Sequence, residues 1–289
     1  MPIPPVFRFR GRREAAADSL PKAGRLRDLY AQEIKTSLAS MLQYRAALAI
    51  YLIGNVLEPL IYLVVWTTVS ASSGGSVGGY APRDFAAYYI AFMLVNQITF
   101  TWVMYEFEYR IRHGSFSAAL LRPVHPIHTD IADNLASKVV SLPLMIAAGG
   151  AMALLFHPAF STPGWAIALF VPALVLAYFV RFLLDWTVAL AAFWTTRVSA
   201  INQIHFMAVL FFSGQIAPLA LLPAPLRTAA TVLPFRWMVG FPVELVLGRL
   251  TFAQALEGLA WQAGWLAAGA VVLRFAWRAS VKNYSAVGG

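Results

Sequence analysis

Three ionisable side chains lie inside long apolar stretches of this sequence. Glu58 lies in one stretch, and Arg181 and Asp185 lie four residues apart in another. A charged group in hydrocarbon is costly, so it is usually paired or functional. Because residues four apart share one face of a helix, Arg181 and Asp185 are predicted to form an ion pair. These groups could be structural, with Glu58 hydrogen-bonded to a neighbouring helix, or they could line the path of a solute.

Catalytic and metal-binding motifs do not account for the other polar residues. The run 74–79, GGSVGG, lacks the Gly-Lys-Ser/Thr of a phosphate loop, and neither HExxH nor GxSxG occurs. His125 and His128 lie near Asp130 and Asp133, but we interpret them as polar loop residues rather than as a metal cluster. We therefore predict no catalytic residue, no metal and no cofactor bound by this chain, and no enzymatic activity of its own.

The composition indicates that these residues belong to a membrane protein. Hydrophobic residues make up 60% of the 289 residues and charged residues 12%, whereas soluble domains average about 45–50% apolar and about 25% charged residues. A soluble fold of this length could not cover so much apolar surface. We expect an all-α, polytopic membrane protein that is surrounded by a lipid bilayer.

The chain carries a net charge of +9, which in a soluble protein would suggest nucleic-acid binding. Here the basic residues are concentrated at the ends of apolar segments and in the N-terminal tail, residues 1–24. We predict that this tail is cytosolic, and we expect no nucleic-acid partner.

Apolar segments of sufficient length define the expected topology, since a span needs about 20 residues. Residues 26–45 have an amphipathic pattern, typical of a helix in the membrane interface or of an extension of the first span. Prolines and charges interrupt residues 220–249, which we interpret as short re-entrant helices shielded by protein. The six predicted spans are residues 46–69, 85–105, 139–156, 165–196, 198–219 and 255–275.

The fourth of these segments is long enough to raise a second possibility. As a helix it would measure roughly 48 Å, against a hydrocarbon core of roughly 30 Å. Two short spans with a turn at Arg181 are one option, but no glycine or proline marks such a turn. We prefer one tilted helix, kinked at Pro172. Six spans also place both basic termini and the basic loop 113–138 on one side, which the positive-inside rule assigns to the cytoplasm.

The loop at 113–138 contains a short apolar segment, Ser115 to Leu121, which ends before Pro123. Phe116, Leu120 and Leu121 cluster on one side if this segment is helical. A short amphipathic helix between two spans can dock into a groove on a soluble partner, or it can lie on the membrane surface.

Three stretches of the chain resemble a bacterial subfamily of ABC type-2 permeases, and the resemblance covers residues 25–285. The first is the loop 112–126, RHGSFSAALLRPVHP, in which a glycine and a short helix precede Leu-Leu-Arg-Pro. The second is 88–97, YYIAFMLVNQ, and the third is 233–248, LPFRWMVGFPVELVLG.

The resemblance implies a permease of the bacterial cytoplasmic membrane, with six spans, an interfacial N-terminal helix and re-entrant helices before the last span. Two permeases, identical or different, would pair with two ATP-binding subunits that hold ATP and Mg²⁺. Permeases of this kind mostly export hydrophobic or amphipathic compounds, including drugs. By position, residues 114–122 would be the coupling helix, and the residues in contact with the ATP-binding subunit would be Gly114, Ser115, Phe116, Leu120, Leu121 and Arg122.

The expected mechanism is alternating access, with a substrate path at the interface between the two permeases. We expect the first, second and fifth spans to line this path, with contacts from Asn55, Glu58, Asn96, Gln97, Gln203 and Gln215. One alternative is a secondary transporter that uses Glu58, Arg181 and Asp185 as a proton or ion relay. Another is an intramembrane enzyme, for which the sequence offers no catalytic constellation.

Overall fold

The computed structural model describes residues 23–43, 45–195 and 198–283. The predicted basic tail, residues 1–24, lies outside this part except for its last two residues, as does residue 196 at the end of the predicted fourth span. The described residues form helices, and the β-structure among them is one isolated bridge between Val77 and Tyr80. The predicted all-α, polytopic membrane fold is confirmed.

Within the described ranges, five helical stretches are long and apolar enough to cross a membrane. They contain α3 (Arg45–Ser72), α4 with α5 (Pro82–Thr99 and Val103–Arg112), α7 (Pro126–Phe156), α8 with its 3₁₀ extension η1 (Gly164–Ala189 and Leu190–Phe193), and α12 (Phe252–Asn283). A sixth candidate is the pair formed by α10 (Ala224–Val232) and the stretch Arg236–Val246, which are bent by 78°. This stretch consists of the π-helical turn η3 (Arg236–Gly240) and α11 (Phe241–Val246).

The helix α4 forms the centre of the bundle. Its residues Phe85 to Met93 are all buried, because α3, α7, α8 and α11 pack around it. A helix that is apolar on every side suits such a position. The other spans expose large apolar side chains, such as Ile50 on α3 and Leu154 on α7, as lipid-facing helices do.

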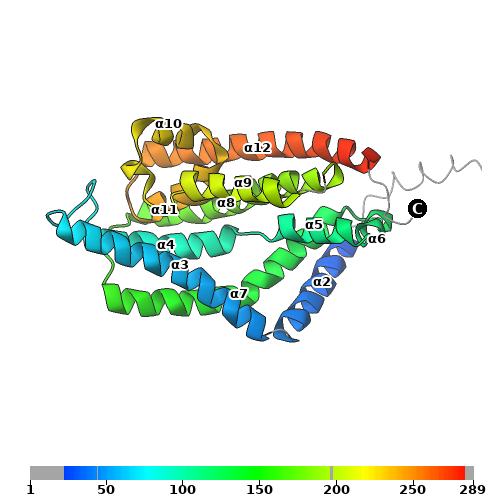
Figure 1. Cartoon of the computed structure of the whole chain (residues 1–289), viewed down its shortest axis with the longest axis horizontal. Helices are drawn as coiled ribbons and strands as arrows, with labels where there is room; N and C mark the ends of the chain where they lie inside the picture. Colours follow the sequence, from blue (N-terminus) through cyan, green and yellow to red (C-terminus); the bar gives the residue numbers. More distant parts are fainter. Residues whose placement is uncertain (1–22, 44, 196–197, 284–289) are drawn as a thin grey trace, which may run out of the picture.

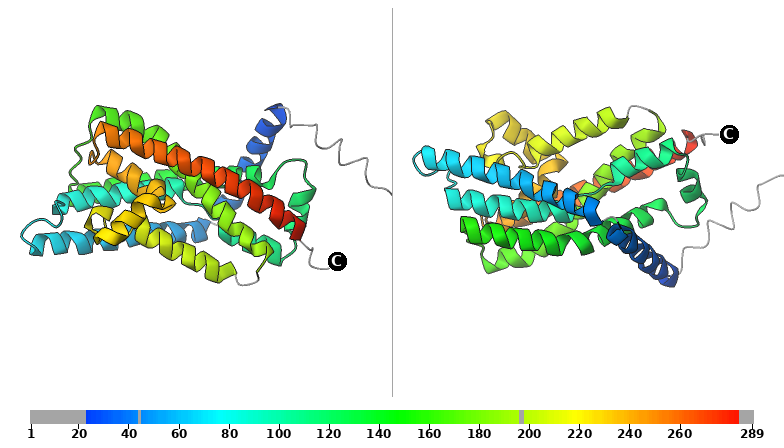
Figure 2. Two further views of the ribbon diagram at one scale, coloured as in Figure 1. Left: turned by 90° about the horizontal axis from the view of Figure 1, so that it is seen from above. Right: turned by 60° about the horizontal axis from the view of Figure 1, so that its bottom comes forward.

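The bundle is elongated, and its two ends carry different elements (Figure 1). The short helix α6 (Phe116–Leu121), the start of α2 (Ala23–Gln43) and the end of α12 lie at one end. The loop after α3 and the helix α10 lie at the other end, and the second pair of views agrees (Figure 2). The segment predicted to be a cytosolic loop therefore lies on the same side as both ends of the described chain.

The third span begins earlier than its hydropathy indicates. We predicted a polar loop up to residue 138, but α7 already begins at Pro126. Proline suits a first helical position, and the Nδ1 atom of His125 accepts a hydrogen bond from the backbone N–H of Ile127 at 3.2 Å. The polar residues Asp130, Asn134 and Lys138 are buried in this helix rather than solvated.

The fourth and fifth predicted spans have different outcomes. The helix α8 continues through Arg181 without a turn and contains Pro172, so the structure has one long helix here. By contrast, α9 (Val198–Phe212) has only 15 residues, or about 22 Å, and ends well before residue 219. Gly214 follows with φ +91°, and a Cβ at this position would collide with the hydroxyl group of Tyr88.

The helix α2 is distinct from α3 and packs across the first half of α7 (Figures 1 and 2). The Tyr30 hydroxyl group lies 3.1 Å from Nδ1 of His128, and Ser37 donates a hydrogen bond to Asp133. Burial raises the pKa of Tyr30, which keeps its hydroxyl group protonated. Protein therefore covers one face of the amphipathic helix.

The packing of α12 against α11 depends on a glycine. A Cβ at Gly258 would collide with the ring of Phe241, which is buried and cannot move aside freely. We expect Gly258→Ala to lower the free energy of unfolding by about 1–3 kcal/mol, measured by thermal unfolding in detergent. Gly264 on the same helix has open space around it, so Gly264→Ala should be neutral or stabilising by up to about 1 kcal/mol. Equal effects of the two substitutions would contradict this account.

Candidate functional site

A cavity of about 380 Å³ lies between α3, α4, α5, α8 and α9. Its wall combines aromatic and apolar side chains with polar groups from helices that are distant in the sequence. The sequence-predicted residues that line it are Asn55, Glu58, Asn96, Gln97, Arg181, Asp185 and Gln215. Gln203 does not line this cavity. It is exposed on α9, and His205 lines the wall instead.

One set of polar contacts in the cavity connects α3, α4 and α7 through amide groups. Asn55 Nδ2 donates to Gln97 Oε1 at 3.0 Å, and Gln97 Nε2 donates to the Ser141 hydroxyl group at 2.8 Å. Ser141 in turn donates to the backbone carbonyl of Ser137 at 2.8 Å. Buried amides that are satisfied in this way hold helices in a fixed register.

The carboxylate of Asp185 is the centre of a second set of contacts. Its Oδ2 accepts a hydrogen bond from Thr101 at 2.8 Å, and its Oδ1 lies 2.9 Å from His205 Nε2. The Nε atom of Arg181 lies 3.8 Å from Oδ2, which is an ion pair but too long for a hydrogen bond. Asp185 is thus satisfied by two other segments as well as by its own helix.

The guanidinium group of Arg181 also has partners outside α8. Its NH1 donates to Asn96 Oδ1 at 2.7 Å and to Thr99 Oγ1 at 3.2 Å. The group lies over the Phe100 ring, 5.1 Å from the centroid, in a cation–π geometry. The hydrogen bonds of Arg181 therefore connect the end of α4 to α8.

The second span is interrupted between α4 and α5, at residues 100–102. The backbone carbonyl of Phe100, freed by the break, accepts hydrogen bonds from Lys138 Nζ at 2.6 Å and from Asn134 Nδ2 at 3.2 Å. Thr101 donates to Asp185 as described above. We refer to residues 100–102 as the joint. Buried polar groups of α7 and α8 hold it, and it was not predicted from the sequence.

Glu58 differs from the other charged residues of the cavity. Gln215 Nε2 donates to its Oε1 at 2.6 Å. The side chain is exposed on α3, and among the described residues no Lys, Arg or His side chain forms an ion pair with it. Its charge is therefore compensated by an amide alone.

The predicted coupling segment is an ordered turn of helix at one end of the bundle. Gly114 has φ +69° and separates α5 from α6, and Ser115 Oγ donates to the backbone carbonyl of Arg110 at 3.2 Å. The Phe116 ring is fully buried, with its centroid 4.9 Å from that of Phe107 and 5.5 Å from that of Phe193. Phe116 therefore anchors α6 to the bundle instead of facing a partner.

The outer side of α6 consists of other residues. Leu120 is half-buried, whereas Leu121 is 87% exposed. Arg122 NH1 lies 3.2 Å from Glu33 Oε1 and so links this segment to α2. Of the predicted contact residues, Leu121 offers the largest apolar surface to a docking partner.

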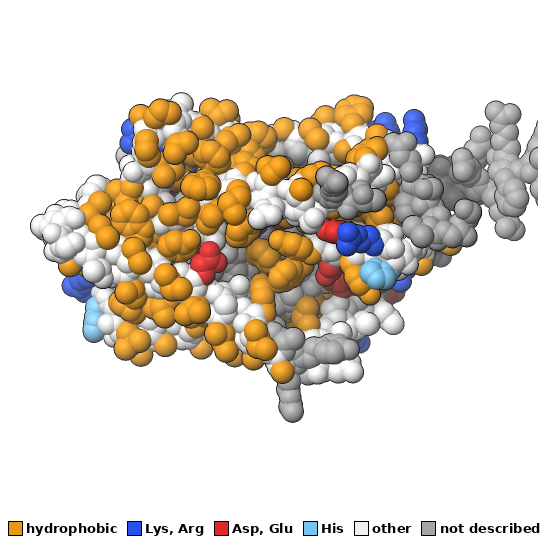
Figure 3. Space-filling view, in the orientation of Figure 1, with side chains coloured by type: hydrophobic (Ala, Val, Ile, Leu, Met, Phe, Trp, Pro, Cys, Tyr) orange, Lys and Arg blue, Asp and Glu red, His pale blue; other side chains and the backbone are white. Residues whose placement is uncertain are grey.

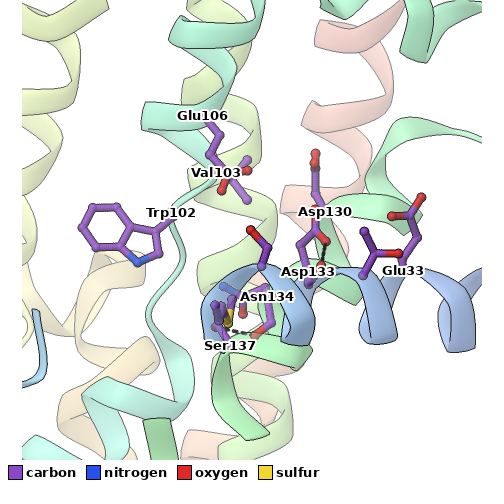
Figure 4. Close-up of a pocket in the computed structure, with 12 residues that line it drawn as sticks. Glu33, Trp102, Val103, Glu106, Asp130, Asp133, Asn134 and Ser137 are labelled. Atoms are coloured by element: carbon purple, nitrogen blue, oxygen red, sulfur yellow. Dashed lines mark hydrogen bonds between the residues drawn. The ribbon is translucent and has the colours of Figure 1, made fainter. Parts of the chain in front are cut away.

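A second cavity, of about 370 Å³, lies between α2, α5 and α7 (Figure 4). Its polar wall includes the carboxylates of Glu33, Glu106, Asp130 and Asp133, together with Asn134. In the sequence, Glu33 lies in the predicted interfacial helix, Glu106 follows the predicted second span, and the other three lie in the predicted loop 113–138, so this site was not predicted. In the part of the chain that the structure describes, no group of three or more His, Asp or Glu side chains could hold a metal ion.

The sequence model of a family described as ABC-2 family transporter protein matches residues 56–288. The match covers most of the chain, including α6, the joint and most of the residues around the first cavity. No curated protein matches the chain.

The contacts around Asp185 lead to a test of the buried ion pair. Asp185→Asn alone leaves the Arg181 guanidinium group buried without its carboxylate, which should cost about 3–5 kcal/mol of stability. Adding Arg181→Gln removes the stranded charge, so the double variant should unfold at a higher temperature than Asp185→Asn. Thermal unfolding in detergent measures this difference. The pair of Glu108 and Arg112, in which the Arg112 side chain is 63% exposed, serves as the control, since Glu108→Gln should change stability much less than Asp185→Asn does. A double variant less stable than Asp185→Asn would show that the pair is not coupled in this way.

Proposed function

This chain belongs to the ABC-2 family of transporter proteins and is a membrane permease of an ABC transporter, and we propose that it exports a hydrophobic or amphipathic compound by alternating access. Permeases of this family lack the ATPase and work with ABC ATP-binding subunits. In our proposal, separate subunits bind ATP and Mg²⁺ at the α6 end of the bundle. That end, with both termini, faces the cytoplasm of a bacterial cell, and the other end faces outward across the cytoplasmic membrane.

The observation that carries this proposal is the cavity between α3, α4, α5, α8 and α9. Its volume of about 380 Å³ lies within the range of roughly 300–1,000 Å³ that is usual for small-molecule sites. Aromatic side chains such as Tyr51, Trp102 and Phe206 line it beside the amides of Asn55 and Gln97. This mixture suits a substrate with a large apolar surface and a few polar groups.

The exposed face of α3 supports a second permease as a partner. Ile50, Ile53 and Leu57 are exposed on this helix, and so is Glu58. The face in Figure 3 is mainly hydrophobic, with acidic side chains in it. A carboxylate facing hydrocarbon is costly. We therefore propose that another permease, rather than lipid, covers α3 at Glu58, and that the exposed residues Ile204 and Phe206 of α9 belong to the same interface.

The route from the ATP-binding subunit to the cavity would follow the second span. The helix α6 is joined through Gly114 to the end of α5, and α5 begins directly after the joint, whose residues Phe100 to Trp102 line the cavity. A push on α6 would thus move α5 against α4 and α8 at the joint. The contacts of Asp185 and Arg181 would be the ones that change.

The alternative of an ion relay receives less support from the geometry. Arg181 and Asp185 belong to one set of contacts, whereas Glu58 bonds to Gln215. No hydrogen bond between described residues connects Glu58 with Asp185. A relay would need an unbroken chain of proton-transferring groups.

Energy supply separates the two functions. In inverted membrane vesicles that contain the permease and its ATP-binding subunits, we expect substrate uptake to require ATP and to persist when a protonophore removes the proton gradient. Transport without ATP that stops with the protonophore would instead support the relay. The Glu58→Gln variant refines the comparison, since a relay would lose nearly all transport, whereas a lining residue should cost roughly 1–2 kcal/mol of substrate binding.

The contact with the ATP-binding subunit is tested at Leu121. Because this side chain is exposed, Leu121→Asp should leave the thermal stability of the permease unchanged. It should weaken co-purification of the ATP-binding subunit at least about tenfold, as expected for an apolar anchor of an interface. Leu121→Met is the matched control and should behave like the wild type. Retained co-purification of Leu121→Asp would exclude α6 as the main contact.

A further inference from the structure

We propose that the transported compound is an amphipathic organic cation and that the cavity between α2, α5 and α7 is its vestibule at the α6 end of the bundle. This inference rests on the proposed export function and specifies its substrate class. It adds a second binding site to the membrane cavity that carries the proposed function.

The vestibule has an excess of negative charge. Four carboxylates line it, and two guanidinium groups, those of Arg110 and Arg122, pair with them. Arg110 NH2 lies 2.8 Å from Asp130 Oδ1 but 3.9 Å from Glu106 Oε2. Arg110 is therefore bound mainly to Asp130 rather than to Glu106. Asp130 also accepts a hydrogen bond from Trp186 Nε1 at 2.8 Å.

Glu106 and Asp133 are the carboxylates that a ligand could reach. Glu106 has no guanidinium group within hydrogen-bond distance, and the hydrogen-bond partner of Asp133 is the Ser37 hydroxyl group. Both side chains are labelled in Figure 4, on either side of the space between α5 and α7. Glu106 shares Arg110 with Asp130, which is the closer partner, so the two carboxylates keep an excess of negative charge that attracts a cation.

A buried acceptor on the same wall gives independent evidence of a donor ligand. Asn134 is only 6% exposed, and its Nδ2 donates to the Phe100 carbonyl. Its Oδ1 has no hydrogen-bond partner in the structure, although buried polar atoms are nearly always satisfied. The bond to Phe100 fixes the amide orientation, so this oxygen is an acceptor that no protein group in the described structure satisfies.

The apolar part of the wall fits the rest of an amphipathic molecule. Met41, Val103 and Trp102 line the vestibule, and Trp102 is 40% exposed. The Trp102 ring packs against Tyr51, Phe100 and Tyr105 at the edge of the vestibule, and an aromatic ring can bind an organic cation through its π-face as well as through its apolar surface. Because a hydrated metal ion would gain nothing from this surface, the wall favours an organic cation.

Trp102 also connects the vestibule with the membrane cavity, since it belongs to the wall of both. It is the last residue of the joint, and a movement of the joint would move its ring. Beyond it lies Glu58, the carboxylate compensated by an amide alone. A cation that leaves the vestibule therefore meets a further carboxylate, one that forms no ion pair with any described residue.

The test compares the binding of two probe ions to the permease, purified together with its ATP-binding subunits in dodecyl maltoside. Tetraphenylphosphonium and tetraphenylborate have nearly the same size and apolar surface but opposite charges. We expect the wild-type complex to bind the cation at least about tenfold more tightly than the anion. The joint substitution of Glu106→Gln and Asp133→Asn should weaken cation binding by about tenfold or more and leave anion binding no weaker than in the wild type.

Two variants control for folding and for charge in general. Glu108→Gln removes one carboxylate from α5 outside the vestibule, so its cation affinity should equal that of the wild type. Ser40 lines the vestibule and is exposed, so Ser40→Asp adds a carboxylate without burying it. It should tighten cation binding about threefold or more, which tests the site even if the double variant is unstable.

Three outcomes would overturn the proposal. Equal binding of the two ions by the wild type would exclude a cationic substrate class. Wild-type cation affinity in both the double variant and Ser40→Asp would exclude the vestibule. Displacement of the cation by added phosphatidylethanolamine, but not by phosphatidylglycerol, would assign the site to a lipid headgroup. In each case, co-purification of the ATP-binding subunits and ATP-dependent transport by the same complex in inverted vesicles separate a failure of the vestibule from a failure of the proposed export function.

Discussion

The carboxylate of Asp185 must be satisfied inside the helix bundle, and the arrangement around the membrane cavity follows from this requirement. Asp185 is 3% exposed, so water cannot compensate its charge, and a buried carboxylate without partners would cost several kcal/mol. Its partners come from three places: Thr101 in the joint, His205 on α9 and Arg181 on α8 itself. One carboxylate thereby sets where the second span is interrupted and which face of α9 is turned inward.

The joint has a second support on the side of α7. A helix that is interrupted in the membrane leaves backbone carbonyls unpaired, which is tolerated only where protein groups replace the lost bonds. Lys138 and Asn134 do so at Phe100. The same Asn134 lines the second cavity, and the same Trp102 lines both cavities. The two cavities therefore share part of their wall at the joint, which α5 connects to α6.

The sequence was sufficient for the features that depend on hydropathy and chain stiffness. It predicted the long helix through Arg181 and the short helix between Gly114 and Pro123, and it singled out seven of the residues that line the membrane cavity. Hydropathy failed at Asp130, Asn134 and Lys138, which resemble loop residues until their partners, distant in sequence, are known. The joint has no glycine or proline to mark it. Choosing between Gln203 and His205 required the position of Asp185, and the inward orientation of Phe116 required that of Phe107 and Phe193.

The contacts of α2 have a consequence for how the chain is synthesised. Tyr30 meets His128, and the two residues are separated by 98 positions. At a translation rate of roughly 5–20 residues per second, His128 is synthesised about 5–20 seconds after Tyr30. The helix α2 therefore has no α7 to pack against during this interval. An amphipathic helix can spend this interval adsorbed at the lipid–water boundary with its apolar face covered. During folding, α2 would thus first anchor the unfinished chain to the membrane surface. It would join the helix bundle only after the third span has been inserted.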